Sequence, residues 1–253
     1  KLLEHIKYKH TDLEFNIASG IKKIENYDLV DLNKINKELD NFFLSRIGIR
    51  TLINNQIGLV ENGNGVIKQN KLINIINNCL ADLDYITSRI YSENVSDYVN
   101  INGNEDLDIF YIPEHLHYII MEIMKNAAVA SYNKSTDAFE DINLNFTEGS
   151  DYIIIKISDK GNSFSKNNLN KMFSYSYSTH PIKITEEYVS GNIPIIGGLG
   201  FGLPMARIYC KYLNGDLIIC PIENYGTDVY IYINKLGNNH EKLFIWIKLW
   251  FIF

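Results

Sequence analysis

The sequence predicts an α+β protein in which a helical N-terminal region precedes a region that mixes helices with a mostly antiparallel sheet. Apolar residues recur at helical spacing from about Leu2 to Arg89. Beyond that stretch, helical segments alternate with short runs that are typical of strands. A polar stretch rich in Asn, Asp and Gly, from Ser92 to Asp108, separates the two patterns. We therefore expect two domains, a helical bundle over residues 1–100 and a second domain over residues 101–253.

The first half is predicted to consist of long helices. Helical stripes of apolar residues occur in two stretches, which contain Ile47, Leu52 and Ile53 in one case and Leu72, Ile75, Ile76, Leu80 and Leu83 in the other. Turn-forming residues from Glu61 to Gly65 separate these stretches.

The second half is predicted to begin with a helix from Glu114 to Asn133. A strand follows from Tyr152 to Ser158, and another helix begins after Gly202. Two further strands are expected, from Leu217 to Cys220 and from Asp228 to Ile233.

The composition excludes several classes of function. A net charge of -6 leaves no basic field for nucleic acid. The three cysteines form no C-x-x-C pair, so the sequence indicates neither a structural zinc site nor a disulfide framework. The nearest approach to a membrane-spanning segment, Leu243 to Phe253, is shorter than the roughly 18 residues required and contains Lys248. We expect a soluble protein with no nucleic-acid partner and no membrane span.

One face of the helix after Pro113 is polar. Glu122 and Asn126 share this face with His115 and Tyr118, whereas Leu116, Ile120, Ile123 and Ala127 can pack on a sheet. The polar face has two interpretations. It faces solvent as in any amphipathic helix, or it faces a pocket in which Asn126 binds metal and phosphate and Glu122 is a base.

Two further groups of residues can serve a nucleotide. Asp159 ends a strand and is followed by Lys160 and Gly161, an arrangement that suits a purine amino group but is also a common turn. The segment GGLGFGLPMAR places glycines at every second position before a helix, where backbone N–H groups stabilise phosphate. A flexible hinge is the other interpretation of these glycines. Thr227 lies either beside the pocket or in a plain turn.

The order and spacing of these motifs resemble the Bergerat-fold (GHKL) ATPases, the group of gyrase, Hsp90 and histidine kinases. Within that group the chain is similar to the mitochondrial protein kinases of the pyruvate and branched-chain 2-oxoacid dehydrogenase complexes. The resemblance rests on YIPEHLHYIIMEIMKNA, FSYSYSTHP, GLGFGLPMARIYCKYLNGDL, NYGTDVYIYI and, in the helical half, FFLSRIGIRTLINNQIGLV. It implies an N-terminal domain like a four-helix bundle, followed by a C-terminal α/β sandwich of the Bergerat type.

The resemblance also implies a role for each candidate residue. Glu122 would be the base that acts on a substrate serine hydroxyl, and Asn126 would coordinate Mg²⁺. Asp159 would bind the adenine amino group, with Thr227 nearby. The purine pocket and the phosphate loop would be completed by Gly161, Gly198, Gly200, Phe201, Gly202 and Leu203.

By the same resemblance, the chain is expected to be an ATP- and Mg²⁺-dependent protein-serine kinase that phosphorylates and inhibits the E1 subunit of a mitochondrial 2-oxoacid dehydrogenase complex. The pyruvate complex is slightly favoured over the branched-chain complex. The lipoyl-bearing E2 core is a further expected partner, the kinase is expected to be a homodimer, and its expected location is the mitochondrial matrix, although no targeting segment stands in this chain.

Three departures from the family pattern affect these expectations. Asn162 and Ser163 follow Gly161 where the family has further glycines, which implies a stiffer loop or weaker ATP binding. Tyr118 replaces the histidine that precedes the catalytic glutamate in the pyruvate branch, so the sequence does not supply that Glu–His dyad. The tail from Leu243 to Phe253 does not follow the family and is either a dimer or partner surface or an altered chain end.

Two other functions stay open. A sensor-type histidine kinase uses the same pocket, but His10 lacks the acidic residue and proline that usually accompany a phosphoacceptor histidine. A nucleotide-gated scaffold without phosphoryl transfer is the other alternative, and the altered glycine box and Tyr118 are the reasons to consider it.

Overall fold

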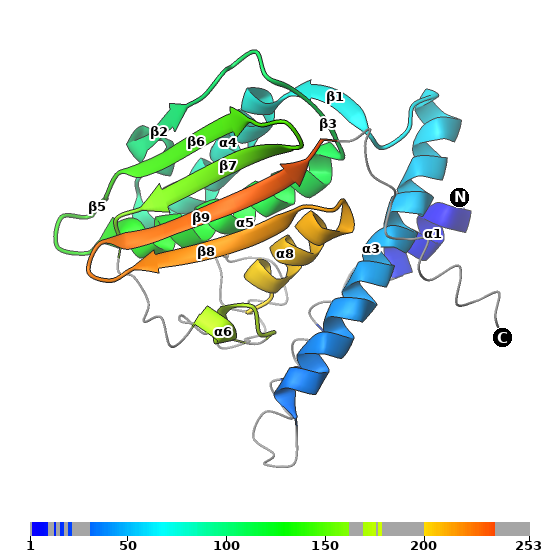
Figure 1. The fold of residues 1–253 in the computed structure, drawn as a ribbon, viewed down its shortest axis with the longest axis horizontal. Coiled ribbons are helices and arrows are strands. Elements are labelled where there is room, and N and C mark those ends of the chain that lie inside the picture. Colours follow the sequence, from blue (N-terminus) through cyan, green and yellow to red (C-terminus); the bar gives the residue numbers. More distant parts are fainter. Residues whose placement is uncertain are drawn as a thin grey trace.

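The computed structural model describes residues 2–9, 13, 16–17, 20–21, 31–161, 169–175, 177–178 and 200–235. Within these residues a mixed sheet is covered on one face by helices, and a long N-terminal helix lies to one side (Figure 1). The predicted fold class is therefore confirmed, including the helical N-terminal region. None of the described helices is long and apolar enough to cross a membrane.

The N-terminal region contains α1 (Leu2–Lys9) and α3 (Leu32–Asn62), which pack together (Figure 1). The Asp31 carboxylate caps α3 by accepting hydrogen bonds from the backbone N–H groups of Asn33 and Lys34, at 3.1 and 3.2 Å. Gly63 ends the helix with a φ of 69°, a left-handed conformation that glycine adopts at low cost. The two predicted stretches are thus separate helices, and the predicted turn lies between them.

The five-stranded sheet has the order β2-β6-β7-β9-β8. Its strands are β2 (Val99–Asn102), β6 (Ile142–Glu148), β7 (Tyr152–Asp159), β8 (Asp216–Ile222) and β9 (Gly226–Asn234). β2 is parallel to β6, and the other neighbours are antiparallel, which confirms the mostly antiparallel pattern. Along β7 and β9 the buried side chains alternate with partly exposed ones, as a sheet with one covered face requires.

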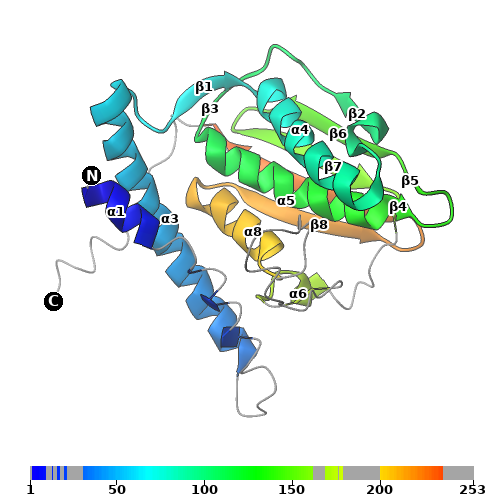
Figure 2. The same ribbon diagram turned by 180° about the vertical axis from the view of Figure 1, so that it is seen from behind.

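Three helices form the second layer: α4 (Leu72–Tyr91), α5 (Pro113–Ser131) and α8 (Gly202–Tyr212). Figure 2 shows all three on the same face of the sheet, with α5 between α4 and α8. The predicted apolar stripe of α5 is buried in this layer, since Leu116, Ile120, Ile123 and Ala127 are each at most 3% exposed. The core between helices and sheet thus fixes which face of α5 remains for function.

The stretch from 92 to 108 is not simply a linker. It contains the 3₁₀ helix η1 (Val95–Tyr98) and the edge strand β2, and it leads into β3 (Asp108–Tyr111). α4 precedes residue 100 and α5 follows it, and the two helices pack together in one layer (Figure 2). The packing is therefore continuous across residue 100. The division into domains at residue 100 stays a prediction.

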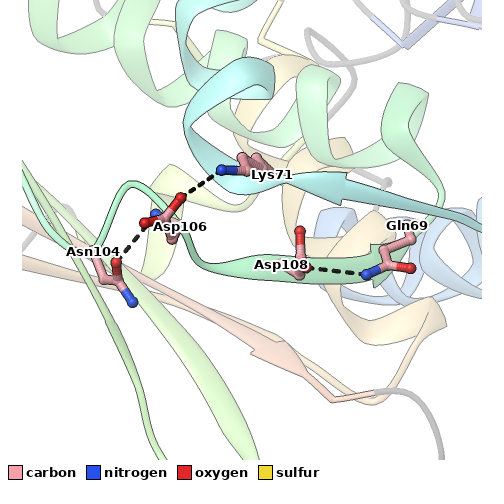
Figure 3. A network of polar contacts seen from close by, with 5 residues as sticks. All are labelled: Gln69, Lys71, Asn104, Asp106 and Asp108. Carbon is pink, nitrogen blue, oxygen red and sulfur yellow. Dashed lines mark hydrogen bonds and ion pairs between the residues drawn. The ribbon is translucent and has the colours of Figure 1, made fainter.

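A two-stranded ribbon of β1 (Lys68–Lys71) and β3 joins α3 to the sandwich. Figure 3 shows its polar contacts: Lys71 pairs with Asp106, and Gln69 donates to Asp108 at 3.0 Å. These groups are exposed, so the contacts contribute little free energy and serve mainly to define the ribbon. The remaining elements are the short hairpin of β4 (Tyr132–Asn133) and β5 (Ala138–Phe139), and the single turn α6 (Leu169–Met172).

Two of the three cysteines, Cys79 and Cys210, are packing residues. All three lie within the described residues and are free, with Cys79 and Cys210 buried and Cys220 exposed. Burial raises the pKa of the Cys79 thiol to about 12, so this thiol is unreactive at neutral pH.

Candidate functional site

Glu122 lies midway along α5 and is largely enclosed. Its Oε1 accepts from the Lys125 ammonium at 2.5 Å, and both side chains are only 15% exposed. Its other oxygen, Oε2, lies against the first residue of α8, because a Cβ on Gly202 would overlap it. The positive end of the α8 dipole therefore faces a carboxylate, which is electrostatically favourable. The structure thus brings two predicted site residues, Glu122 and Gly202, into contact.

Asn126 lies one helical turn after Glu122 and is exposed. Its side chain makes no hydrogen bond to the part of the chain that the structure describes. An amide oxygen without a protein partner is a suitable ligand for a hard cation such as Mg²⁺. Among the described residues no group of three or more His, Cys, Asp or Glu side chains could hold a metal, so a cation here would need further oxygen ligands from its substrate.

The histidines of α5 do not lie beside Glu122 as a catalytic partner would. His115 packs on the Tyr209 ring of α8 at 4.7 Å, and burial lowers its pKa to about 4, which keeps it neutral. Tyr118 packs on the same ring at 4.9 Å.

His117 lies at another position around the helix and contacts Asp82 of α4 at 3.0 Å. The charged neighbour of Glu122 among the described residues is Lys125. Lys125 is part of the same sequence motif, but no role was predicted for it.

Asp159 ends β7 directly opposite Thr227 of β9. The two residues are 6% and 7% exposed. The Gly161 N–H donates to Asp159 Oδ1 at 3.0 Å. Burial raises the Asp159 pKa to about 6, although the N–H groups of Gly161 and Thr227 act in the opposite direction. A buried carboxylate at this strand end can accept a hydrogen bond from a ligand amino group.

Glycine is required at two positions around Asp159. A Cβ at Gly161 would overlap the Ala130 carbonyl, so this turn lies directly on the C-terminal end of α5. Gly226 has a φ of 153°, and a Cβ there would overlap the Asp159 carbonyl. Gly226 was not among the predicted site residues. The sequence contained a signal for it, the Gly-Thr-Asp tripeptide, but only the pairing of β7 with β9 brings it to Asp159.

The remaining predicted residues are placed as follows. Gly200 has a φ of 76°, in the left-handed region, and precedes the buried Phe201. Leu203 is half-buried in the first turn of α8. Gly198, Asn162, Ser163 and the tail from Leu243 to Phe253 lie outside the described residues.

These contacts define two groups of residues that share α5 as their support. The helix end of the site consists of Glu122, Lys125, Asn126 and Gly202, and the sheet end consists of Asp159, Gly161, Gly226 and Thr227. The helix end offers a carboxylate, an amide without a hydrogen-bond partner among the described residues, and the N-terminus of α8. The sheet end offers a buried acceptor. Together they can accept a ligand that carries an amino-substituted ring at one end and an anionic group at the other.

The chain matches two known families over most of its length. Residues 111–236 match the histidine kinase-, DNA gyrase B-, and HSP90-like ATPases. Residues 1–77 match a second family, described as mitochondrial branched-chain alpha-ketoacid dehydrogenase kinase.

Individual relatives have the same character. The chain is 34% identical over 255 residues to a mitochondrial pyruvate dehydrogenase (acetyl-transferring) kinase of Schizosaccharomyces pombe, covering 96% of this chain and 60% of the relative. It is 30% identical over 257 residues to the kinase of the same name in Arabidopsis thaliana, covering 96% of this chain and 69% of the relative. It is 31% identical over 267 residues to isozyme 1 of the mitochondrial pyruvate dehydrogenase (acetyl-transferring) kinase of Homo sapiens, covering 96% of this chain and 60% of the relative. The aligned part of the chain thus spans 60–69% of the length of these relatives.

Proposed function

This chain belongs to the mitochondrial 2-oxoacid dehydrogenase kinase family of GHKL ATPases, and we propose that it is a protein-serine kinase that uses Mg·ATP. One observation carries the proposal: α5 supports both ends of the site. The Glu122 carboxylate and the exposed Asn126 amide lie at mid-helix, and the turn after Asp159 packs on the helix terminus. This arrangement suits a nucleotide that lies along the helix, with its base and its phosphates at opposite ends.

At the sheet end, Asp159 accepts a hydrogen bond from the adenine amino group, beside Thr227. Binding offsets the cost of burying this carboxylate, because a buried acceptor without enough donors is expensive. At the helix end, the phosphates are bound by the positive end of α8 and by the backbone from Gly200 to Gly202. The Asn126 amide oxygen would hold Mg²⁺, and the ion would supply charge neutralisation of the phosphates.

Glu122 is the base in this proposal. It accepts the proton of the substrate serine hydroxyl as the serine oxygen forms its bond to the γ-phosphorus and the bond to the β,γ-bridging oxygen breaks, which releases ADP. Lys125 and the α8 N-terminus hold the carboxylate in place. Since phosphoryl transfer depends mainly on positioning and charge, this fixed orientation is the main contribution of the helix end.

The proposed substrate is the E1 subunit of the pyruvate dehydrogenase complex, which the kinase inhibits by phosphorylation. The names of the relatives above favour this complex over the branched-chain complex, although the N-terminal match carries the branched-chain name. The lipoyl-bearing E2 core, a homodimeric state and a mitochondrial matrix location belong to the same proposal.

A nucleotide-gated scaffold is a second candidate, which one observation favours. In the described structure Tyr118 packs on Tyr209 in place of a histidine, so Glu122 has Lys125 as its charged neighbour. The Glu122 oxygen that accepts from Lys125 must leave that contact before it can accept a proton from a substrate hydroxyl, which favours nucleotide binding without transfer.

Phosphoryl transfer from labelled ATP to purified E1 subunits of both complexes tests the proposal. We expect label on a pyruvate dehydrogenase E1 serine, stable to acid, and labelling slowed by about 10²–10⁴-fold with Glu122→Gln. Acid-labile label on the kinase itself would identify a histidine kinase instead. ATP binding without transfer to either E1 would identify the scaffold.

A further inference from the structure

The N-terminal half of α3 makes hydrogen bonds to residues just after α6, far away in the sequence. The Asn36 side chain donates to Ser174 Oγ at 2.9 Å and accepts from the Tyr175 N–H at 3.1 Å. One turn further along α3, Asp40 Oδ1 accepts from the Tyr175 hydroxyl at 2.9 Å. Tyr175 is therefore held through both its backbone and its side chain by one face of α3.

An aromatic cluster joins the same helix to the residue that precedes α8. Phe43 stacks on Tyr175 at 5.4 Å and meets the Phe201 ring edge-on at 5.8 Å. Tyr175 and Phe201 also contact each other, with their ring centroids 5.0 Å apart. The three rings are 0%, 2% and 6% exposed, so they pack as a closed unit in which none can move alone.

Phe201 links this cluster to the helix end of the site. Its carbonyl accepts the Met205 N–H at 3.0 Å and so begins the hydrogen bonding of α8. Gly200 before it is in the left-handed conformation, and Gly202 after it contacts Glu122. The position of the Phe201 ring therefore fixes the backbone of the glycine turn.

Charges on α8 reinforce the link. Asp40 is half-buried beside Tyr175, and Lys211 and Arg207 of α8 act on its carboxylate as positive neighbours. Arg207 in turn contacts the Phe173 ring at 4.4 Å and Asp216 at 3.1 Å. One carboxylate on α3 thus interacts with Tyr175 and with the charges of α8.

We propose that Asn36, Asp40 and Phe43 are positioning residues for the phosphate-binding turn, so that α3 sets the affinity of the site for Mg·ATP. The inference rests on the proposed function, because it assumes that the phosphates bind at Gly200 to Gly202. By linkage, Mg·ATP must stabilise the same contacts in return. The later α3 residues Ile49, Leu52 and Val60 are exposed and take no part in the cluster, so they serve as a reference for the segment from Asn36 to Phe43.

Mutations that remove single contacts test the inference through Mg·ATP affinity measured by calorimetry. Tyr175→Phe removes only the hydroxyl, and Asp40→Ala removes its acceptor. Each should weaken Mg·ATP by about two- to thirtyfold, the range that couplings through packed networks produce. Because both remove the same hydrogen bond, the double variant should be weakened by less than the product of the two factors.

Controls separate positioning from a general loss of stability. Asp40→Asn keeps an acceptor for the tyrosine and should restore most of the affinity. Ile49→Ala on the exposed part of α3 and Tyr85→Phe on the surface of α4 should match the wild type. In transfer assays Tyr175→Phe and Asp40→Ala should raise KM for ATP and leave kcat nearly unchanged, whereas a merely structural defect lowers the amount of active enzyme.

The outcomes are distinct. If the wild type binds Mg·ATP and Tyr175→Phe and Asp40→Ala bind it equally well, the inference is wrong and the proposed function stands. If the wild type binds no Mg·ATP, both fail.

Amide hydrogen exchange of the wild type with and without Mg·ATP avoids variants that do not fold. Slower exchange over residues 36–43 with no change over residues 49–59 supports the inference. Equal protection of both segments, or of neither, overturns it.

Discussion

The sheet end and the helix end of the site hold their residues by different means. At the sheet end, Asp159 and Thr227 are paired by the register of β7 and β9, and backbone N–H groups orient the carboxylate. At the helix end, Glu122 is held by the side chain of Lys125 and by the start of α8. The start of α8 in turn packs through Phe201 on α3.

This difference teaches which parts of the site tolerate change. A backbone ladder keeps its register when surface side chains are replaced, because the hydrogen bonds belong to the main chain. A carboxylate oriented by side chains moves when any of its supports is altered. We therefore expect substitutions of surface side chains near the sheet end to leave nucleotide binding nearly unchanged, whereas substitution of Glu122 or of the groups that contact it should change the rate of transfer.

The largest effect is expected for Glu122→Gln, which keeps the shape of the side chain but removes the negative charge that accepts a proton. General-base catalysis contributes about 10²–10⁴-fold, or roughly 3–5 kcal/mol. Transfer should fall by that factor, while Mg·ATP affinity stays within about threefold. Single-turnover transfer and ATP titration measure the two quantities.

Asn126→Ala provides the contrast at the same end, because loss of the metal ligand should weaken Mg·ATP binding and transfer together. Near-normal transfer by Glu122→Gln would exclude the base role and favour catalysis by positioning alone.

At the sheet end, Asp159→Ala should weaken ATP binding at least about tenfold. Loss of a buried hydrogen bond to a charged group costs about 1.5–3 kcal/mol, and the change leaves kcat at saturating ATP much less affected. Calorimetry on the folded variant checks this expectation. Unchanged affinity would reduce Asp159 to a turn residue and place the base of the nucleotide elsewhere.

The pKa of Asp159 is raised to about 6, which predicts that this buried carboxylate lowers the free energy of unfolding of the nucleotide-free protein. Between about pH 4 and pH 6 the folded state binds a proton that the unfolded state releases, so the free energy of unfolding falls as pH rises through this window. Asp159→Asn should therefore match the wild type at pH 4 and be more stable at pH 7, by at most about 3 kcal/mol. Chemical unfolding at both pH values measures the difference, and equal stability at pH 7 would contradict it.

Two glycine substitutions compare the ends most directly. At Gly161 an added Cβ meets the Ala130 backbone, which cannot yield, so Gly161→Ala should cost about 1–3 kcal/mol of unfolding free energy. At Gly202 the three atoms nearest to the added Cβ all belong to the end of the Glu122 side chain, which can turn away at the cost of its present orientation. Gly202→Ala should therefore be nearly as stable as the wild type but slower in transfer, by about tenfold or more, because the carboxylate is displaced. Thermal unfolding and transfer assays separate the two, and the reverse pattern would disprove the distinction.

Much of the architecture could be predicted because its signals are local. The apolar stripe of α5 and the alternation of β7 and β9 follow from residues close together in the sequence, and the observed elements agree with the expected ones to within about two residues. β2 and β6 were not predicted. β2 is a four-residue edge strand of mixed polarity, and such a strand is stabilised by its neighbour rather than by its own sequence.

The sequence by itself determined which residues were available for the site and on which elements they stand, through the motifs around Glu122, Asp159 and Gly202. Only the tertiary structure decided their partners. The pairing of β7 with β9 brings Thr227 and Gly226 to Asp159, and the packing of α8 on α5 places His115 against Tyr209 and leaves Lys125 as the neighbour of Glu122. Contacts of α3 with Tyr175 and Phe201 join segments far apart in the chain. Periodicity and spacing report the conformation of a few neighbouring residues, whereas a partner is chosen by which surfaces the whole core brings together.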